Sequence, residues 1–173
     1  MKTFLIILIF SFLMSCTIKQ KPVSYYLSSG IEDIKIFPVN KEDSAKINNI
    51  NIASDKSLAE CQKLKNAKCS DDRGNRYLDA TFPKGIYNFR ILLFDNFKLP
   101  KNAKEGESRI RITIGTHDNI ERIEILKYTD ENTKKAIEDV FRLKELNVWT
   151  SAKIYGIPVN EQFEISVFVK KKL

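Results

Sequence analysis

The chain has 173 residues, of which 43% are hydrophobic and 29% are charged, and it carries a formal net charge of +7. Its five prolines are scattered, and the sequence holds no internal repeat and no low-complexity stretch. The composition therefore excludes a repeat array and a proline-rich rod.

The N-terminus has the pattern of a bacterial lipoprotein signal. Lys2 precedes an apolar run that extends from Phe4 to Met14 and ends in the sequence LMSC. A run of about 12 residues is too short for a bilayer span, which needs about 20, but it suits a signal peptide. The ending resembles a lipobox, so we expect removal of residues 1–15 and lipidation of Cys16. The alternative is an ordinary signal peptide in which Cys16 is incidental.

The predicted signal places the mature chain in the cell envelope. Thr17 follows the cysteine and no acidic run comes after it, which favours a lipid-anchored protein on the periplasmic side of the outer membrane. Export also excludes nucleic acid as a partner. The lysines at 63, 65, 68 and 170–172 would suit an anionic membrane or an acidic cell-wall polymer such as peptidoglycan, or serve only solubility.

Two further cysteines form an even pair in an exported chain. Cys61 and Cys69 lie in a helical-looking stretch that we expect to break near Asn66. One straight helix would hold the thiols about 12 Å apart, too far for a bond. We predict a disulfide; the alternative is two free or metal-bound thiols, for which a chain with the single histidine His117 offers few further ligands.

The residues between the signal and the second half of the chain carry weaker patterns. Residues 16–30 are expected to be a tether, and residues 31–80 an N-terminal segment with the disulfide. IEDIKIFPV starts like a strand, and Ile47, Ile50 and Ile52 alternate imperfectly. A helix is then expected over SDKSLAECQKLK, with Ser54 or Asp55 as its N-cap.

Residues 81–173 show clear elements. Pro83 lies near a helix start, followed by apolar residues at helical spacing: Ile86, Phe89, Leu92, Leu93 and Phe97. A loop containing Pro100 precedes a strand in which Ile110, Ile112 and Ile114 alternate. THDN predicts a turn in which Asp118 and Asn119 tolerate positive φ, and IERIEILKY returns as the second strand.

The last elements are a helix and a strand. TDENTKKAIEDVFRLKEL predicts an amphipathic helix capped by Thr129 or Asp130, with Ala136, Ile137, Val140 and Phe141 on one face. In the final strand, apolar residues occupy every second position from Phe163 to Val169. The expected fold class is α+β, with a small antiparallel sheet of about three strands and two helices on one face.

The second half resembles the C-terminal domain of TonB, in the version common in Bacteroidetes-type bacteria. FPKG before a helix, the LPKNAKEGES step, the RIRITIGTHDNIERIEILK hairpin and WTSAKIYGIPV follow the family order over just over half of the chain. The matching positions are Phe82, Pro83, Gly85, Pro100, Ala103, Trp149, Gly156, Pro158 and Val159.

The sequence departs from the family pattern at several points. Asn119 replaces the hairpin glycine, and Ser151 replaces the proline after the tryptophan. TonB itself has an uncleaved transmembrane helix that meets the ExbB–ExbD motor, and then a proline-rich rod, whereas a lipobox stands here instead. The chain therefore resembles the receptor-binding half of an energy transducer without its motor-coupling helix.

The resemblance implies a protein-binding module that serves outer-membrane transport or envelope assembly. In the family, a receptor segment pairs with an edge near the end of the chain. We expect one edge of the final strand to be open or covered only by the SAKIYG segment, with the Gly156-x-Pro158 corner setting where the strand begins. The expected contact residues are Ile154, Tyr155, Gln162, Glu164 and Ser166. The alternative is a structural envelope lipoprotein that binds peptidoglycan or braces another envelope protein.

Motifs for catalysis are absent from the sequence. It contains no G-x-S-x-G, no H-E-x-x-H and no Gly-rich phosphate loop, and His117 lies in the predicted hairpin turn. The acidic stretch DDRGNRYLD lacks the spacing of a calcium loop. We expect no enzymatic activity, no cofactor and no metal.

Overall fold

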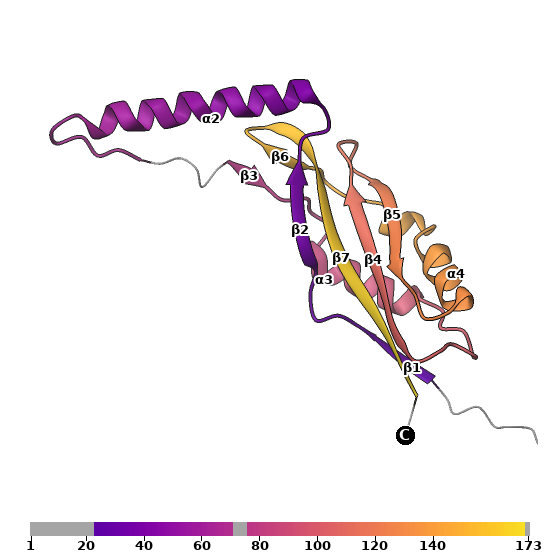
Figure 1. Ribbon diagram of the computed structural model, residues 1–173. Coiled ribbons are helices and arrows are strands. Elements are labelled where there is room, and N and C mark those ends of the chain that lie inside the picture. Colours follow the sequence, from indigo (N-terminus) through magenta and orange to yellow (C-terminus); the bar gives the residue numbers. More distant parts are fainter. Residues whose placement is uncertain (1–22, 71–75, 172–173) are drawn as a thin grey trace, which may run out of the picture.

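The computed structural model describes residues 23–70 and 76–171, which form an α+β fold, as predicted (Figure 1). The predicted signal peptide, Cys16 and the start of the tether lie outside these residues. In the described part, seven strands form one antiparallel sheet. The strands are β1 (Val23–Leu27), β2 (Glu32–Phe37), β3 (Tyr77–Leu78), β4 (Gly106–Ile114), β5 (Ile120–Lys127), β6 (Ala152–Ile154) and β7 (Ile157–Lys171). The helices are α2 (Lys41–Gln62), α3 (Gly85–Asn96) and α4 (Glu131–Val140), with a 3-10 turn at Lys144–Leu146.

The long strand β7 lies in the middle of the sheet. On one side β4 pairs with it over the whole of Gly106–Ile114. On the other side β1, β2 and β6 follow one another along β7, which takes up the edge that the sequence predicted to be open. That prediction is wrong because two strands of the N-terminal part, one of them inside the expected tether, pair with β7. Together with β3 and β6, they also make the sheet larger than the expected three strands.

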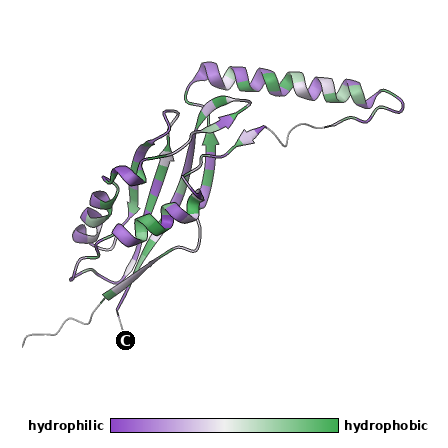
Figure 2. Cartoon of the chain, turned by 180° about the vertical axis from the view of Figure 1, so that it is seen from behind, coloured by the Kyte–Doolittle hydropathy of each residue, from purple (hydrophilic) through white to green (hydrophobic). Residues whose placement is uncertain are grey.

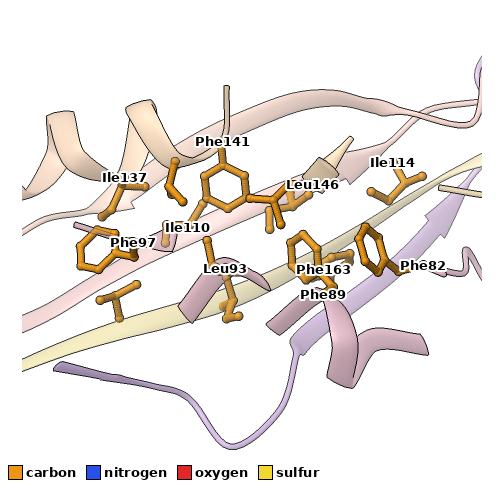
Figure 3. Close-up of a cluster of buried hydrophobic side chains, with 14 of the residues drawn as sticks. Phe82, Phe89, Leu93, Phe97, Ile110, Ile114, Ile137, Phe141, Leu146 and Phe163 are labelled. Carbon is orange, nitrogen blue, oxygen red and sulfur yellow. The ribbon is translucent and has the colours of Figure 1, made fainter. Parts of the chain in front are cut away.

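One face of the sheet carries the core, which α3 and α4 cover (Figures 1 and 3). The alternating isoleucines of β4 are fully buried, and so are Phe163, Ile165 and Val167 of β7. The ring of Trp149 lies 5.1 Å from that of Phe89 on α3, centroid to centroid. The predicted inward faces of both strands are therefore confirmed, and aromatic rings fill the space between sheet and helices.

Helix α2 begins earlier than the sequence pattern suggested. The Asn40 side chain accepts a hydrogen bond from the backbone N–H of Asp43 at 2.8 Å, so it is the N-cap, and Ser54 and Asp55 lie inside the helix. Ile47 is buried against Ile154 of β6, while Ile52 is exposed. The imperfect alternation of isoleucines thus belongs to a helix, which contacts the β6–β7 hairpin through Ile47 and through the Asn51 side chain that accepts a hydrogen bond from Tyr155.

The far part of α2 projects beyond the sheet and ends in the predicted disulfide (Figure 1). Cys61 and Cys69 are bonded, with Cα atoms 5.9 Å apart. The helix ends at Gln62, and Asn66 adopts a positive φ of 70°. The expected break near Asn66 is confirmed, and it brings the two thiols together.

Two turns and one helix differ in detail from the expectation. In the β4–β5 turn Asp118, with φ of 58°, takes the left-handed conformation, and Asn119 does not. In the β6–β7 hairpin Tyr155 and Gly156 both have positive φ, so the corner is a two-residue turn. Helix α4 is capped by Asp130 as predicted, but it ends at Val140 instead of running through residue 146.

Candidate protein-binding surface

The five predicted contact residues do not form one surface. Ile154 is 5% exposed and lies under α2, where the Tyr155 hydroxyl donates a hydrogen bond to Asn51 Oδ1 at 2.6 Å. Gln162, Glu164 and Ser166 alternate along β7 on the face opposite the helices and are all buried. Because β7 has strands on both sides, its three residues do not lie on an open edge, and Ile154 of β6 is paired with both β3 and β7.

The sheet face opposite the helices instead holds a network of ion pairs. Glu164, only 3% exposed, accepts two hydrogen bonds from the Arg111 guanidinium, at 2.8 and 3.0 Å, and lies 3.9 Å from Arg109. Glu107 accepts from Lys127 at 3.0 Å and from Ser166 at 2.8 Å. The hydrogen bond from Lys127, with those from Ser166 and Arg109, lowers the pKa of Glu107 to about 2.

These side chains line a shallow depression of about 450 Å³. Each arginine or lysine of the network meets a carboxylate of a neighbouring strand or of its own strand. The charged groups of the network thus pair with one another and connect β4, β5 and β7. Few unpaired charged groups are left there to bind a ligand.

A different surface lies on the outer side of α3. Tyr87, Ile91 and Phe94 follow one another at helical spacing and are 69%, 38% and 42% exposed. Figure 2 views the molecule from this side, where α4 is mostly hydrophilic and α3 carries hydrophobic stretches. We call these three side chains the α3 patch.

The patch exists because α3 is apolar on both sides. Its inner side chains Phe89 and Leu93 are buried to 1% exposure or less. A helix that is hydrophobic all round is normally buried all round. Here the outer half is covered only in part, by Tyr25 against Phe94, and exposed contiguous apolar side chains mark interaction sites.

The patch borders a shallow depression of about 190 Å³ that also involves Leu27 of β1, Arg90 and Asp95. Arg90 donates a hydrogen bond to the Ser28 carbonyl, whereas its buried Nε has no acceptor in the described part of the chain. Apolar side chains thus line most of this depression, with Arg90 and Asp95 as its charged groups.

Strand β1 holds the patch in place from the side. The Tyr25 hydroxyl donates to the Phe94 carbonyl at 2.5 Å, and the two rings lie 4.8 Å apart. Burial, and then the nearby Asp95 carboxylate, raise the pKa of Tyr25, so the hydroxyl keeps its proton. The segment that fills the edge of β7 therefore also supports α3.

Sequence reasoning missed the patch although its signal was present. The five apolar positions assigned to the inner face of the helix left Tyr87, Ile91 and Phe94 unassigned. An apolar residue on each side of one helix indicates either complete burial or a second partner. Only the packed structure shows which of these applies to α3.

Most of the residues that carry the family resemblance lie in the core or at turns. Phe82 and Trp149 are buried with ring centroids 5.2 Å apart, and Ala103 and Val159 are buried as well. Gly85 and Gly156 adopt positive φ. Pro83 and Pro158 are exposed, and Pro100 is half-buried. Packing and turn geometry account for the buried residues and the two glycines.

None of the described helices has both the length and the apolar character needed to cross a bilayer. Within residues 23–70 and 76–171, no group of three His, Cys, Asp or Glu side chains is placed to hold a metal ion.

Comparison of the chain with protein-family models, with curated proteins and with solved structures finds no match in any of the three. The resemblance to the TonB C-terminal domain therefore stays a prediction that rests on the sequence motifs.

Proposed function

We propose that this chain is a lipid-anchored, periplasm-facing, TonB-like protein-binding module that serves outer-membrane transport or envelope assembly. The observation that carries the proposal is the α3 patch, because three large apolar side chains lie exposed together on one helix face. The partner is an envelope protein that presents an apolar surface to Tyr87, Ile91 and Phe94.

The proposed mode of binding differs from strand addition to β7. Both sides of β7 are paired within the chain, so a partner peptide would first have to displace β1 or β2. The patch needs no such rearrangement. Helix faces of this kind bind through apolar side chains three to four positions apart, as Tyr87, Ile91 and Phe94 are.

The test uses the full chain in its native envelope. A photo-crosslinking phenylalanine analogue replaces Tyr87, and in a matched control it replaces Tyr77, which is 49% exposed on β3. We expect one defined protein adduct from position 87 that Ile91→Lys abolishes. Ile52→Lys, a change at a 58% exposed position on α2, should leave the adduct intact.

Two outcomes would count against the proposal. The first is that, in folded protein, positions 77 and 87 give the same adducts or position 87 gives no adduct. The second is binding of the chain to purified cell-wall sacculi that Ile91→Lys does not reduce, without a protein adduct. That result would favour the structural, peptidoglycan-binding alternative.

A further inference from the structure

The end of the sheet where β1 begins and β7 finishes is opposite the projecting part of α2 (Figure 1). Val23, at the start of β1, pairs with Lys171 near the end of β7. The loop between α3 and β4 lies at the same end, because Gly106 at its exit pairs with Val169. Three stretches that are distant in the sequence thus build one surface, which we call the sheet tip.

The sheet tip is rich in lysine. Lys98, Lys101 and Lys104 come from the loop and Lys170 and Lys171 from β7, and all five are exposed. The nearby acidic residues include the exposed Asp95 and Glu105 and the half-buried Asp130, whose carboxylate accepts a hydrogen bond from the Lys104 backbone N–H at 2.9 Å. Lysines outnumber these carboxylates, so the sheet tip carries a local positive charge that attracts an anionic surface.

Aromatic side chains accompany the lysines. Tyr26 of β1 is 42% exposed and stacks on Phe168 of β7 with ring centroids 5.0 Å apart. The Lys170 ammonium lies 5.1 Å from the centroid of the Tyr26 ring. Aromatic rings beside long cationic side chains are the combination that occupies the headgroup level of a bilayer.

The position of the predicted lipid anchor connects this surface with the membrane. Only six residues, Thr17–Pro22, separate Cys16 from Val23. Even a fully extended chain over these seven steps spans at most about 25 Å. A lipid on Cys16 would therefore hold the start of β1 within that distance of the membrane surface.

We propose that the sheet tip contacts the anionic phospholipid surface to which the chain is anchored, through Tyr26 and the five lysines. The contact rests on the proposed lipid anchor at Cys16. It orients the molecule, because the sheet tip then faces the headgroups while the disulfide end of α2 points into the periplasm. The lysines bind the negative surface electrostatically, and each adds about 1 kcal/mol of attraction, or roughly a fivefold change in partition.

The experiment uses the full chain, purified with its lipid and placed in vesicles of phosphatidylethanolamine and phosphatidylglycerol that contain brominated acyl chains. Introduced cysteines at Tyr26→Cys, Asn102→Cys and Ile52→Cys carry a fluorophore. Asn102 is exposed in the lysine loop, so it serves if Tyr26→Cys disturbs β1, and Ile52 on α2 is the control. We expect bromine quenching and a blue shift at positions 26 and 102, and neither at position 52.

The charge requirement is tested by the double variant Lys170→Glu/Lys171→Glu, with Lys63→Glu/Lys65→Glu near the disulfide as the matched control. The variant changed at 170 and 171 should lose the quenching at position 102, and the variant changed at 63 and 65 should keep it. Replacement of phosphatidylglycerol by phosphatidylcholine should also abolish the quenching at position 102 in the wild-type background. Equal quenching at positions 52 and 102 in lipidated protein overturns the contact alone. Absence of lipid on Cys16 by mass spectrometry overturns the anchor itself, and a sheet tip that binds sacculi in preference to vesicles overturns the choice of phospholipid.

Discussion

The backbone N–H of Ser151 donates a hydrogen bond to Asp118 Oδ1 at 2.8 Å, and the Ser151 hydroxyl in turn receives one from the Asp118 backbone N–H at 3.0 Å. The hydroxyl oxygen also lies 2.7 Å from the carbonyl oxygen of Gly115. Ser151, the residue before β6, therefore fixes the β4–β5 turn by hydrogen bonds to Asp118 and Gly115. The hydrogen bonds from the Ser151 backbone and side chain also lower the pKa of Asp118.

Ser151→Ala should lower the free energy of unfolding by about 1–3 kcal/mol, because the Asp118 N–H loses its acceptor and the Gly115 carbonyl and Asp118 Oδ1 lose the hydroxyl hydrogen that lies between them. Ser151→Pro should cost more, since it also removes the backbone N–H that donates to Asp118. Urea denaturation checks both variants against Thr150→Ala, a change at an exposed neighbour. Equal unfolding free energies for Ser151→Ala and Thr150→Ala would show that the hydrogen bonds of the Ser151 hydroxyl do not contribute to stability.

The two sides of α3 should respond differently to truncation. Phe89 is fully buried among the rings of Phe82, Trp149 and Phe163, so Phe89→Ala should destabilise the fold by about 3–5 kcal/mol. Tyr87→Ala, only two positions away but 69% exposed, should change the unfolding free energy by less than about 0.5 kcal/mol. Thermal unfolding measures both, and a large loss for Tyr87→Ala would mean that the patch is structural.

Protonation of Glu107 should lower the stability of the fold in acid. Its folded-state pKa of about 2 lies below the ordinary value of 4.5, chiefly because Lys127 donates a hydrogen bond to its carboxylate. A depressed pKa contributes stability above the unfolded value that is lost as the pH falls from about 4.5 to about 2. Urea midpoints of wild type and Glu107→Gln should therefore differ most at neutral pH and converge near about pH 2. A constant difference across this range would contradict the assignment.

Glu161 should have the opposite effect on the pH dependence of stability. Burial raises the pKa of this carboxyl, against the hydrogen bond that the Ala80 N–H donates to it at 2.6 Å. A raised pKa means that the folded state takes up a proton first, so this residue's contribution to stability increases as the pH falls toward and below the raised value. Glu161→Gln keeps an acceptor for Ala80 and should gain stability relative to wild type at neutral pH. Measured urea midpoints that show no gain there would refute this.

The disulfide should stabilise its own segment more than the sheet. Cys61 and Cys69 lie at the end of α2 that projects beyond the sheet. In the entropic picture, closing so short a loop stabilises the folded segment by roughly 2–3 kcal/mol, because it removes conformational entropy from the unfolded chain. Reduction should speed amide hydrogen exchange over residues 55–70, while exchange in β4 and β7 stays unchanged. Two thiols that react with an alkylating agent in freshly isolated, unreduced protein would show that the bond is absent.

Local patterns in the sequence determined many of the elements. The alternation of Ile110, Ile112 and Ile114 predicts both the strand and its buried face, because side chains on a strand repeat every two residues. Asp130 supplies a cap that depends only on the next three residues. The disulfide follows from an even pair of cysteines in one short segment.

Only the tertiary structure decided which strands lie beside β7 and which face of α3 stays exposed. Val23 and Lys171 pair across almost the whole described chain, and no local signal tells a strand which edge it will meet. The exposed stripe of Tyr87, Ile91 and Phe94 depends likewise on how far the sheet extends beneath α3. Pairing and burial of this kind are long-range, because backbone hydrogen bonds and apolar contacts do not depend on separation along the sequence.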